Sequence, residues 1–314
     1  MVSSSLKKRK LSPMLPVVTL LTGTRTIIDT GARMSYPLLP VFARGVQVDV
    51  SAIVSILALM QLLGLAAPFI GRISEQRGRK FTILLGLLLY VAGMFSVFIL
   101  PDFTGLAVAL LLSSLGRTAI GPAIQAYIGD KVPYNRRGLY LGLVELAWSG
   151  AFLFGVPAMT WLIATFNWQA PFLALAILGA ASFVLIWLRV EADAPATHHI
   201  AFLPALRAAI SSPMALAGLG LGFSISAANQ LVSVVFGTWI EASFGIQLAA
   251  LAVAAAVIGL SELAGEGIVT FFADKFGKRA LVLVGVSGNI LACIILPLTG
   301  GDLSLALVGL FLFY

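Results

Sequence analysis

Residues 71–80 of this 314-residue chain read Gly-Arg-Ile-Ser-Glu-Gln-Arg-Gly-Arg-Lys, a charged string between two long apolar runs. Four bases and an acid cannot lie in hydrocarbon, so the string must form a tight loop at a membrane surface. A similar string, Asp-Lys-Phe-Gly-Lys-Arg, occupies residues 274–279, and aligning Gly78 with Gly277 gives an offset of 199 residues. The repeat predicts a membrane domain built from two related halves, an arrangement typical of transporters.

Composition and hydropathy predict an all-α polytopic membrane protein. Hydrophobic residues make up 60% of the chain and charged residues 11%, whereas soluble domains carry about 25% charged residues. Apolar runs of about 20 residues, the length needed to cross a bilayer, recur throughout. They predict nine complete spans, at about residues 15–43, 50–71, 81–100, 104–128, 138–163, 170–189, 213–240, 247–272 and 280–299.

The spans predict two pseudo-symmetric six-helix halves, of which the second is incomplete. Residues 1–189 hold the first half, the polar segment 190–212 is expected to be a cytoplasmic linker, and residues 213–314 form a partial second half. A tenth span begins near Leu303 and stops at Tyr314, so as a helix it reaches only about 18 Å of a roughly 30 Å hydrocarbon core. We therefore expect this sequence to be a fragment, or a truncated product, of a longer protein.

The basic residues gather on one side of the predicted membrane. Of the 20 lysines and arginines, 16 fall in loops on that side: Lys7, Lys8, Arg9, Lys10, Arg72, Arg77, Arg79, Lys80, Lys131, Arg136, Arg137, Arg189, Arg207, Lys275, Lys278 and Arg279. The opposite loops hold Arg44 with four acids, Asp49, Asp102, Glu241 and Asp302. This bias predicts a cytoplasmic N-terminus and cytoplasmic basic loops in a cell (inner or plasma) membrane. Topology thus explains the net charge of +7, and no nucleic-acid partner is expected.

Nothing in the sequence predicts an enzyme, a metal site or a cofactor. Cys293 is the single cysteine and lies in an apolar run, so neither a disulfide framework nor a cysteine metal motif is expected. His198 and His199 adjoin in a polar loop that offers no further ligand. The chain also lacks a nucleophile with an oriented base and a phosphate-binding loop.

The loop at 71–80 and its membrane context carry a family resemblance. The chain resembles the major facilitator superfamily of secondary transporters over essentially its whole length. The loop is similar to that family's signature between helices 2 and 3, with Glu75 where aspartate is usual and Gln76 where a base is usual. The matching positions are Gly71, Glu75, Gly78, Arg79 and Lys80, and those of the second copy are Asp274, Gly277, Lys278 and Arg279.

That resemblance implies a cytoplasmic gate. Glu75 would face a helix N-terminus in the other half, where the helix dipole favours a carboxylate, and Arg79 would pair with Asp130. The alternative is a basic turn that serves only membrane topology.

Two further segments resemble motifs of the drug/proton antiporters in that family. In predicted span 4, Arg117 precedes Gly121 by four residues, as in the helix-4 antiporter motif. In span 5, Gly150, Gly155 and Pro157 are similar to the antiporter Gly-Pro motif. One extra residue separates the two glycines, and another separates Gly155 from Pro157.

Charged side chains inside the spans are the main functional signal. Each costs about 2.5–3.5 kcal/mol to insert and so needs a partner or a water-filled cavity. Those predicted to couple protons or to act in transport are Asp29, Arg33, Arg117, Glu145, Glu262 and Glu266, and those predicted to line the substrate cavity are Asn229, Gln230 and Trp148. They fall in spans 1, 4, 5, 7 and 8, which the resemblance implies are the cavity helices.

Spacing along span 1 places three charges on one face. Arg25, Asp29 and Arg33 follow at i, i+4 and i+8 and form a stripe. The stripe is either a structural triad or a relay in which a proton or substrate competes for the pairing. Arg25 lies nearest the basic side and is expected to snorkel toward it.

The embedded acids are the candidates for proton coupling. Glu262 and Glu266 share a helix face, so at least one is expected to hold a proton, either for coupling or within a hydrogen-bonded pair. Glu145 is expected to be neutralised by Arg117. Trp148, beside it, either packs in the protein or stacks on substrate.

The preferred function is proton-coupled antiport that exports a small amphipathic compound by alternating access around a midplane site. The implied partners are a small-molecule substrate, protons and the lipid bilayer. Four embedded acids against three bases favour cationic or neutral cargo. The alternatives are an importer of a sugar, nucleoside or organic acid, and a truncated membrane protein that does not transport.

Overall fold

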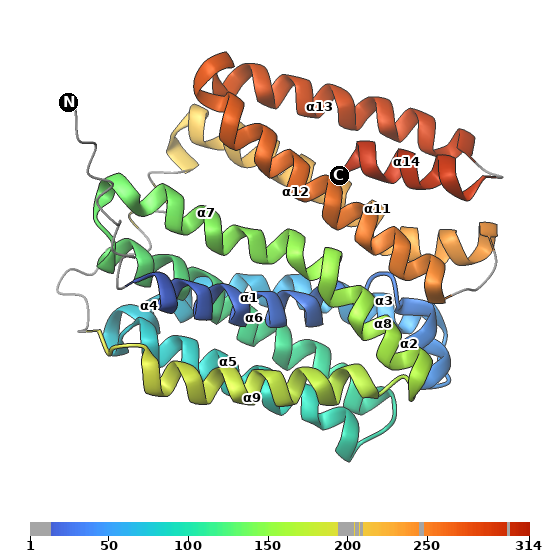
Figure 1. The fold of residues 1–314 in the computed structure, drawn as a ribbon, viewed down its shortest axis with the longest axis horizontal. Helices are drawn as coiled ribbons and strands as arrows, with labels where there is room; N and C mark the ends of the chain where they lie inside the picture. Colours follow the sequence, from blue (N-terminus) through green and yellow to red (C-terminus); the bar gives the residue numbers. More distant parts are fainter. Residues whose placement is uncertain (1–13, 194–203, 205–206, 208–209, 245–247, 300–301) are drawn as a thin grey trace, which may run out of the picture.

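A computed structural model describes residues 14–193, 204, 207, 210–244, 248–299 and 302–314. These residues form helices joined by short turns (Figure 1). In chain order they are α1 (Leu15–Arg33), α2 (Leu39–Gly45), α3 (Val50–Leu63), η1 (Gly64–Ala66), α4 (Ala67–Arg77), α5 (Arg79–Ile99), α6 (Phe103–Lys131), α7 (Tyr134–Gly150), η2 (Ala151–Gly155), α8 (Val156–Thr165), α9 (Ala170–Arg189), α11 (Pro213–Phe244), α12 (Leu248–Phe276), α13 (Lys278–Ile295), η3 (Leu296–Thr299) and α14 (Leu303–Phe313).

Eight helical segments of the described chain are long and apolar enough to cross a membrane. The 19-residue helix α1 falls outside this set because Arg25, Asp29 and Arg33 lower its hydropathy. These eight segments and α1 correspond to the nine predicted spans, and α14 begins at Leu303, where the tenth was expected. The all-helical membrane fold is therefore confirmed.

The predicted first span, 15–43, is not one helix. α1 ends at Arg33 and α2 begins at Leu39, with turns between them. Pro37 lies in this break, and proline can neither donate a helical hydrogen bond nor follow a residue in helical conformation without strain. The break turns the chain between α1 and α3.

The predicted fifth span contains a π-helical turn, η2, between α7 and α8. This turn runs from Ala151 to Gly155, and it accommodates the extra residue between the glycines of the antiporter-like motif. Single π-helical turns inside α-helices occur mostly at functional sites. Here the turn carries Phe152, whose ring lies 3.6 Å from the guanidinium carbon of Arg33.

The two basic loops have the same backbone conformation. Gly78, between α4 and α5, has φ 94° and ψ 158°, and Gly277, between α12 and α13, has φ 81° and ψ 144°. Because glycine adopts a positive φ without a steric penalty, each copy of the loop needs its glycine. The side chains of Asp274 and Lys278 lie outside the described residues, and so do His198, His199 and residues 1–13.

The N-terminus of α5 is capped by a residue far away in the sequence. Asp193, which follows α9, accepts hydrogen bonds from the backbone N–H groups of Arg79 at 2.5 Å and Lys80 at 3.0 Å. These groups have no partner within the helix, and the helix dipole favours a carboxylate there. The beginning of the predicted linker therefore holds α9 to α5.

We expect Asp193→Ala to lower the free energy of unfolding by about 1 kcal/mol, because α5 loses its cap. Glu191→Ala is the matched control, since Glu191 is 82% exposed and its carboxylate lies 3.3 Å from Lys131. Thermal unfolding of both purified variants measures the difference. Equal unfolding midpoints would contradict a capping role for Asp193.

The helices form a first group, α1–α9, and a second group, α11–α14 (Figure 1). In the first group, α5 packs on α6 and α9, and α1 packs on α6, α7 and α9. A Cβ on Gly86 would lie 2.8 Å from the carbonyl oxygen of Gly116, so glycine lets α5 and α6 approach this closely. In the second group, α13 and α14 pack on α12. The groups meet where α12 contacts α7, η2 and α8, and where α11 contacts α2.

The two groups are joined at one end and separate toward the other. We name the end that holds Arg44 and Glu241 the far end, and the opposite end, which holds Gly78 and Gly277, the basic end. At the far end, Nη1 of Arg44 lies 2.6 Å from Oε1 of Glu241, and a Cβ on Gly237 would lie 2.7 Å from the carbonyl oxygen of Tyr36. Toward the basic end, residues 216–226 of α11 are exposed.

Candidate functional site

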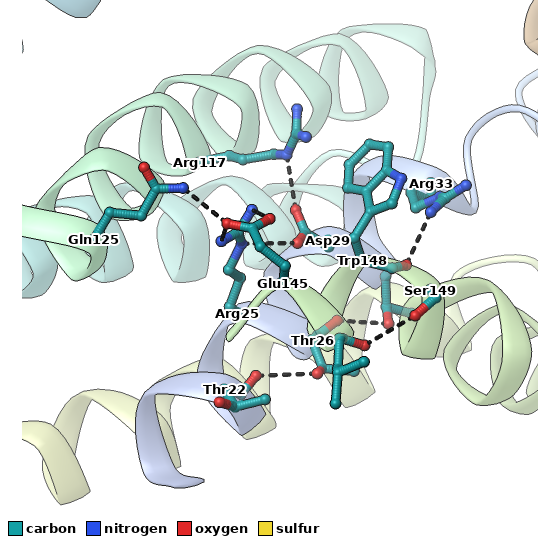
Figure 2. Close-up of polar contacts among 12 residues, drawn as sticks. Thr22, Arg25, Thr26, Asp29, Arg33, Arg117, Gln125, Glu145, Trp148 and Ser149 are labelled. Carbon is teal, nitrogen blue, oxygen red and sulfur yellow. Dashed lines mark hydrogen bonds and ion pairs between the residues drawn. The ribbon is translucent and has the colours of Figure 1, made fainter. Parts of the chain in front are cut away.

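The embedded charges of α1, α6 and α7 lie close together (Figure 2), and Glu262 of α12 joins them at the junction of the two groups. We name this set the central network. It contains Arg25, Asp29, Arg33, Arg117, Gln125, Glu145, Trp148 and Glu262. All but Gln125 were singled out from the sequence as embedded or cavity residues.

Arg33 of α1 and Glu262 of α12 form a buried ion pair across the two groups. Nη1 and Nη2 of Arg33 donate to the two carboxylate oxygens of Glu262 at 2.6 Å each. The two side chains are 4% and 11% exposed. Removing one partner of such a buried pair leaves an uncompensated charge and costs about 3–5 kcal/mol. The link is therefore firm only while both charges are present.

Trp148 and Phe152 hold the Arg33 guanidinium in place. Their ring centroids lie 4.1 and 3.6 Å from its carbon atom, one helical turn apart along α7 and η2. Arg33 also donates to the backbone oxygen of Trp148 at 2.8 Å, and the indole N–H donates to Glu262 at 3.1 Å. Trp148 therefore packs on the ion pair.

Asp29 lies between two bases. Its Oδ1 accepts from Nε of Arg117 at 2.9 Å, and its Oδ2 lies 3.4 Å from Nε of Arg25. The Asp29 side chain is 3% exposed, and its Oδ2 makes no hydrogen bond with a described residue. The sequence placed Asp29 between Arg25 and Arg33, in either a structural triad or a relay. In the structure the two bases beside Asp29 are Arg25 and Arg117, because Arg33 pairs with Glu262 instead.

Glu145 pairs with Arg25 and not with Arg117. Nη1 and Nη2 of Arg25 donate to its two oxygens at 2.8 Å each, and Nε2 of Gln125 donates at 2.8 Å. The expectation that Arg25 snorkels is therefore wrong: its side chain is 14% exposed and bridges Glu145 and Asp29. The sequence could not reveal this, because α7 and α1 bring Glu145 beside Arg25 only after packing.

The remaining predicted cavity residues lie around this network. Ser149, which is buried, donates to Glu266 at 3.3 Å, so Glu266 and Glu262 contact different groups. Gln230 of α11 donates to the hydroxyl of Tyr36 at 2.7 Å. Asn229, beside it, is half-buried.

The predicted gate residues lie at the basic end. Nε of Arg79 is 3.4 Å from Asp130, as the resemblance implied, and Nη1 donates to Ser74 at 3.1 Å. Glu75 lies on α4 and is half-buried. Asp193 was not predicted from the sequence. Its hydrogen bond from the backbone N–H of Arg79 is the shortest contact in this region. The sequence signal for it was only an acid soon after an apolar span.

Comparisons with known proteins agree with this architecture. The family model described as Major Facilitator Superfamily matches residues 21–314. The chain is similar to Multidrug resistance protein 2 of Bacillus subtilis (strain 168), with 25% identity over 323 residues that cover 98% of this chain and 79% of that protein. It is also similar to the uncharacterized MFS-type transporter YwfA of the same organism, with 31% identity over 139 residues that cover 43% of this chain and 33% of that protein.

A solved structure has the same fold. The crystal structure of a D-xylose-proton symporter matches with a TM-score of 0.73 and 16% identity, over 96% of this chain and 79% of that one. At this identity the likeness establishes the fold alone. The aligned segment spans only a third of the length of YwfA, so relatives such as that one extend well beyond the matched part.

Proposed function

This chain belongs to the Major Facilitator Superfamily and is a multi-pass secondary transporter, and we propose that it works as a proton-coupled antiporter that exports small amphipathic compounds. The observation that carries the proposal is the Arg33–Glu262 pair, whose 2.6 Å bonds join the two helix groups. Alternating access requires contacts between the groups that form in one state and break in the other. A charge pair that a proton can neutralise is such a contact.

In the proposed cycle the state with a closed far end contains ionised Glu262 bound to Arg33. When the far end opens, the pair separates and Glu262 takes a proton from that side. When the far end closes again, the proton leaves toward the basic end and Arg33 neutralises the carboxylate. A ligand that binds only one of these states shifts the balance between them.

Charge and shape support the proposed direction of transport. The positive-inside rule places the basic end in the cytoplasm, and the two groups are joined at the far end by Arg44 and Glu241. Glu145 and Arg117 are 44% and 43% exposed in this state, and we infer that a compound reaches them from the cytoplasm. The similarity to a protein named for multidrug resistance supports export of amphipathic compounds.

Transport in everted membrane vesicles tests the proposal. The vesicles are acidified inside, and a pH-sensitive dye reports proton efflux when ethidium or 2-naphthoate, an amphipathic cation and an amphipathic anion, is added. Antiport predicts that one of these compounds enters the vesicles while protons leave. Proton movement in the same direction as the compound would instead support an importer working by symport, and no coupled movement of either compound would contradict the proposal.

The Arg44–Glu241 contact is expected to hold the far end closed. Exposed ion pairs contribute up to about 1 kcal/mol, which corresponds to a roughly fivefold change in the population of the open state. In a Cys293→Ser background, Arg44→Glu should therefore speed labelling of a Gln230→Cys reporter by a membrane-impermeant maleimide added from the far side.

The double reversal Arg44→Glu with Glu241→Arg is the matched control, because it restores opposite charges. It should bring the labelling rate back toward that of the parent. A labelling rate unaffected by the single reversal would show that this contact does not hold the far end closed.

A further inference from the structure

A cavity of about 300 Å³ lies in the first group, and Arg25, Asp29 and Arg117 of the central network line it. Its walls come from α1, η1, α4 and α6, and they contain both apolar and charged residues. The lining residues are Arg25, Ile28, Asp29, Gly64, Ala67, Arg117, Thr118, Ile120, Gly121, Pro122 and Gln125. Its volume is at the lower limit of the range typical of small-molecule sites.

Asp29, the acid that lines this cavity, already has two basic neighbours. Arg25 donates to both oxygens of Glu145 and also lies 3.4 Å from Asp29. Of the charged residues that line the cavity, two are bases and one, Asp29, is an acid. The acids that made the sequence favour a cationic cargo therefore offer little to a cation here, because Glu262 is bound to Arg33 and Glu266 lies outside the lining.

Arg117 keeps unused hydrogen-bond donors in this cavity. It donates only from Nε, to Asp29, and no described residue accepts from its two Nη atoms. Its side chain is 43% exposed, and Figure 2 shows both Nη atoms turned away from Asp29. The ring of Trp148 lies 5.0 Å from its guanidinium carbon. The guanidinium is thus positioned by Asp29 and Trp148, with its forked edge open.

We propose that this cavity binds amphipathic compounds that carry a carboxylate or a similar planar oxyanion. The two Nη atoms of Arg117 hold the anion, since an arginine fork matches the two oxygens of a carboxylate. The apolar body of the ligand lies against Ala67 and Pro122, which line the cavity and are not buried. When Arg117 binds the ligand, Asp29 keeps Arg25 as a neighbouring base.

The inference rests on the proposed function only for the claim that such compounds are then transported. Binding itself is tested on the purified full chain in lipid nanodiscs by calorimetric titration. The probes share one ring system: 2-naphthoate, the neutral 2-naphthamide and the cationic 2-naphthylmethylamine. We expect 2-naphthoate to bind at least about tenfold more tightly than the other two, because an arginine fork binds a carboxylate bidentately.

Two variants locate the site. Arg117→Lys retains the charge beside Asp29 but loses the fork, so 2-naphthoate should bind about tenfold more weakly while 2-naphthamide is unaffected. Arg136→Lys, at an exposed position of the basic end, is the matched control. Gly121→Phe should fill the cavity and abolish binding of both compounds, because a Cβ at Gly121 meets nothing within 4 Å.

Gly129→Phe is the control for the cavity-filling variant, since Gly129 also has open space, lies on the same helix and does not line the cavity. Preferential binding of the amine, or full affinity for 2-naphthoate in Arg117→Lys or Gly121→Phe, would overturn the inference. Binding of 2-naphthoate as expected, with no proton movement in vesicles for either 2-naphthoate or ethidium, would refute the proposed antiport and leave the binding site standing.

Discussion

Replacing Glu262 by glutamine is expected to abolish proton-driven transport, with a loss of at least about 100-fold. The amide retains the shape of the side chain and can still accept the Trp148 indole N–H, whose bond to Glu262 is 3.1 Å long. It cannot take or release a proton, and it leaves Arg33 without its buried counter-charge. Uptake into everted vesicles, with and without a pH gradient, measures the loss.

Glu191→Gln is the control for that variant, because Glu191 lies at the basic end and is 82% exposed. Glu145→Gln should also stop uphill transport, since it releases Arg25 from its bidentate pair. Glu262→Gln and Glu145→Gln are both expected to insert into the membrane in normal amounts. Full gradient-driven uptake by Glu262→Gln would refute the coupling role of the pair.

Gly259→Leu is expected to lower transport at least about tenfold, because bulk at a close helix contact forces the helices apart. A Cβ at position 259 would overlap the backbone nitrogen of Leu153 and lie 2.9 Å from the carbonyl carbon of Phe152. These are backbone atoms in η2, so no side-chain rotation relieves the overlap. Moving α12 away from η2 also lengthens the distance between Arg33 and Glu262.

The matched control is Gly265→Leu on the same helix, where a Cβ meets nothing within 4 Å. Transport and thermal unfolding of the two variants are compared. A Gly259→Leu protein that transports as well as Gly265→Leu would show that the contact between α12 and η2 is not needed for function.

Most of the fold could be predicted because it follows from local sequence. Predicted span 170–189 coincides with α9, Ala170–Arg189, since a run of apolar residues bounded by polar ones defines a spanning helix. The turn glycines Gly78 and Gly277 were also visible, because both follow a charged string. The break between α1 and α2 was missed although Pro37 and Pro40 were its signal, because hydropathy alone bridges a short turn.

The pairing of charges could not be predicted, because it depends on how helices rotate and pack. The i, i+4 spacing correctly placed Arg25 and Asp29 on one face, but it gave no reason for Arg33 to turn toward α12. Glu145 and Arg117 were matched on the sequence, whereas the structure gives each a partner on α1. Asp193 was overlooked because its partners are backbone amides, which leave no mark in the sequence.

Sequence and structure also lead to different expectations about the cargo. Counting embedded acids against bases favoured a cationic or neutral compound. The structure shows that such a count is a poor guide, because Asp29, Glu145 and Glu262 are each within 3.5 Å of an arginine. A ligand interacts with the side chains that still have unused hydrogen-bond donors. In the cavity of the first group, we propose that this side chain is Arg117.

In the proposed cycle the charge on Glu262 controls whether the far end is closed. The most direct test is the distance across the far end, measured by double electron–electron resonance between spin labels at Ser51→Cys and Ser243→Cys, both exposed, in a Cys293→Ser background. We expect acid pH to add a population with a longer distance, and Glu262→Gln to have this population at every pH. A distance independent of pH, or a pH response that survives in Glu262→Gln, would contradict the proposed cycle.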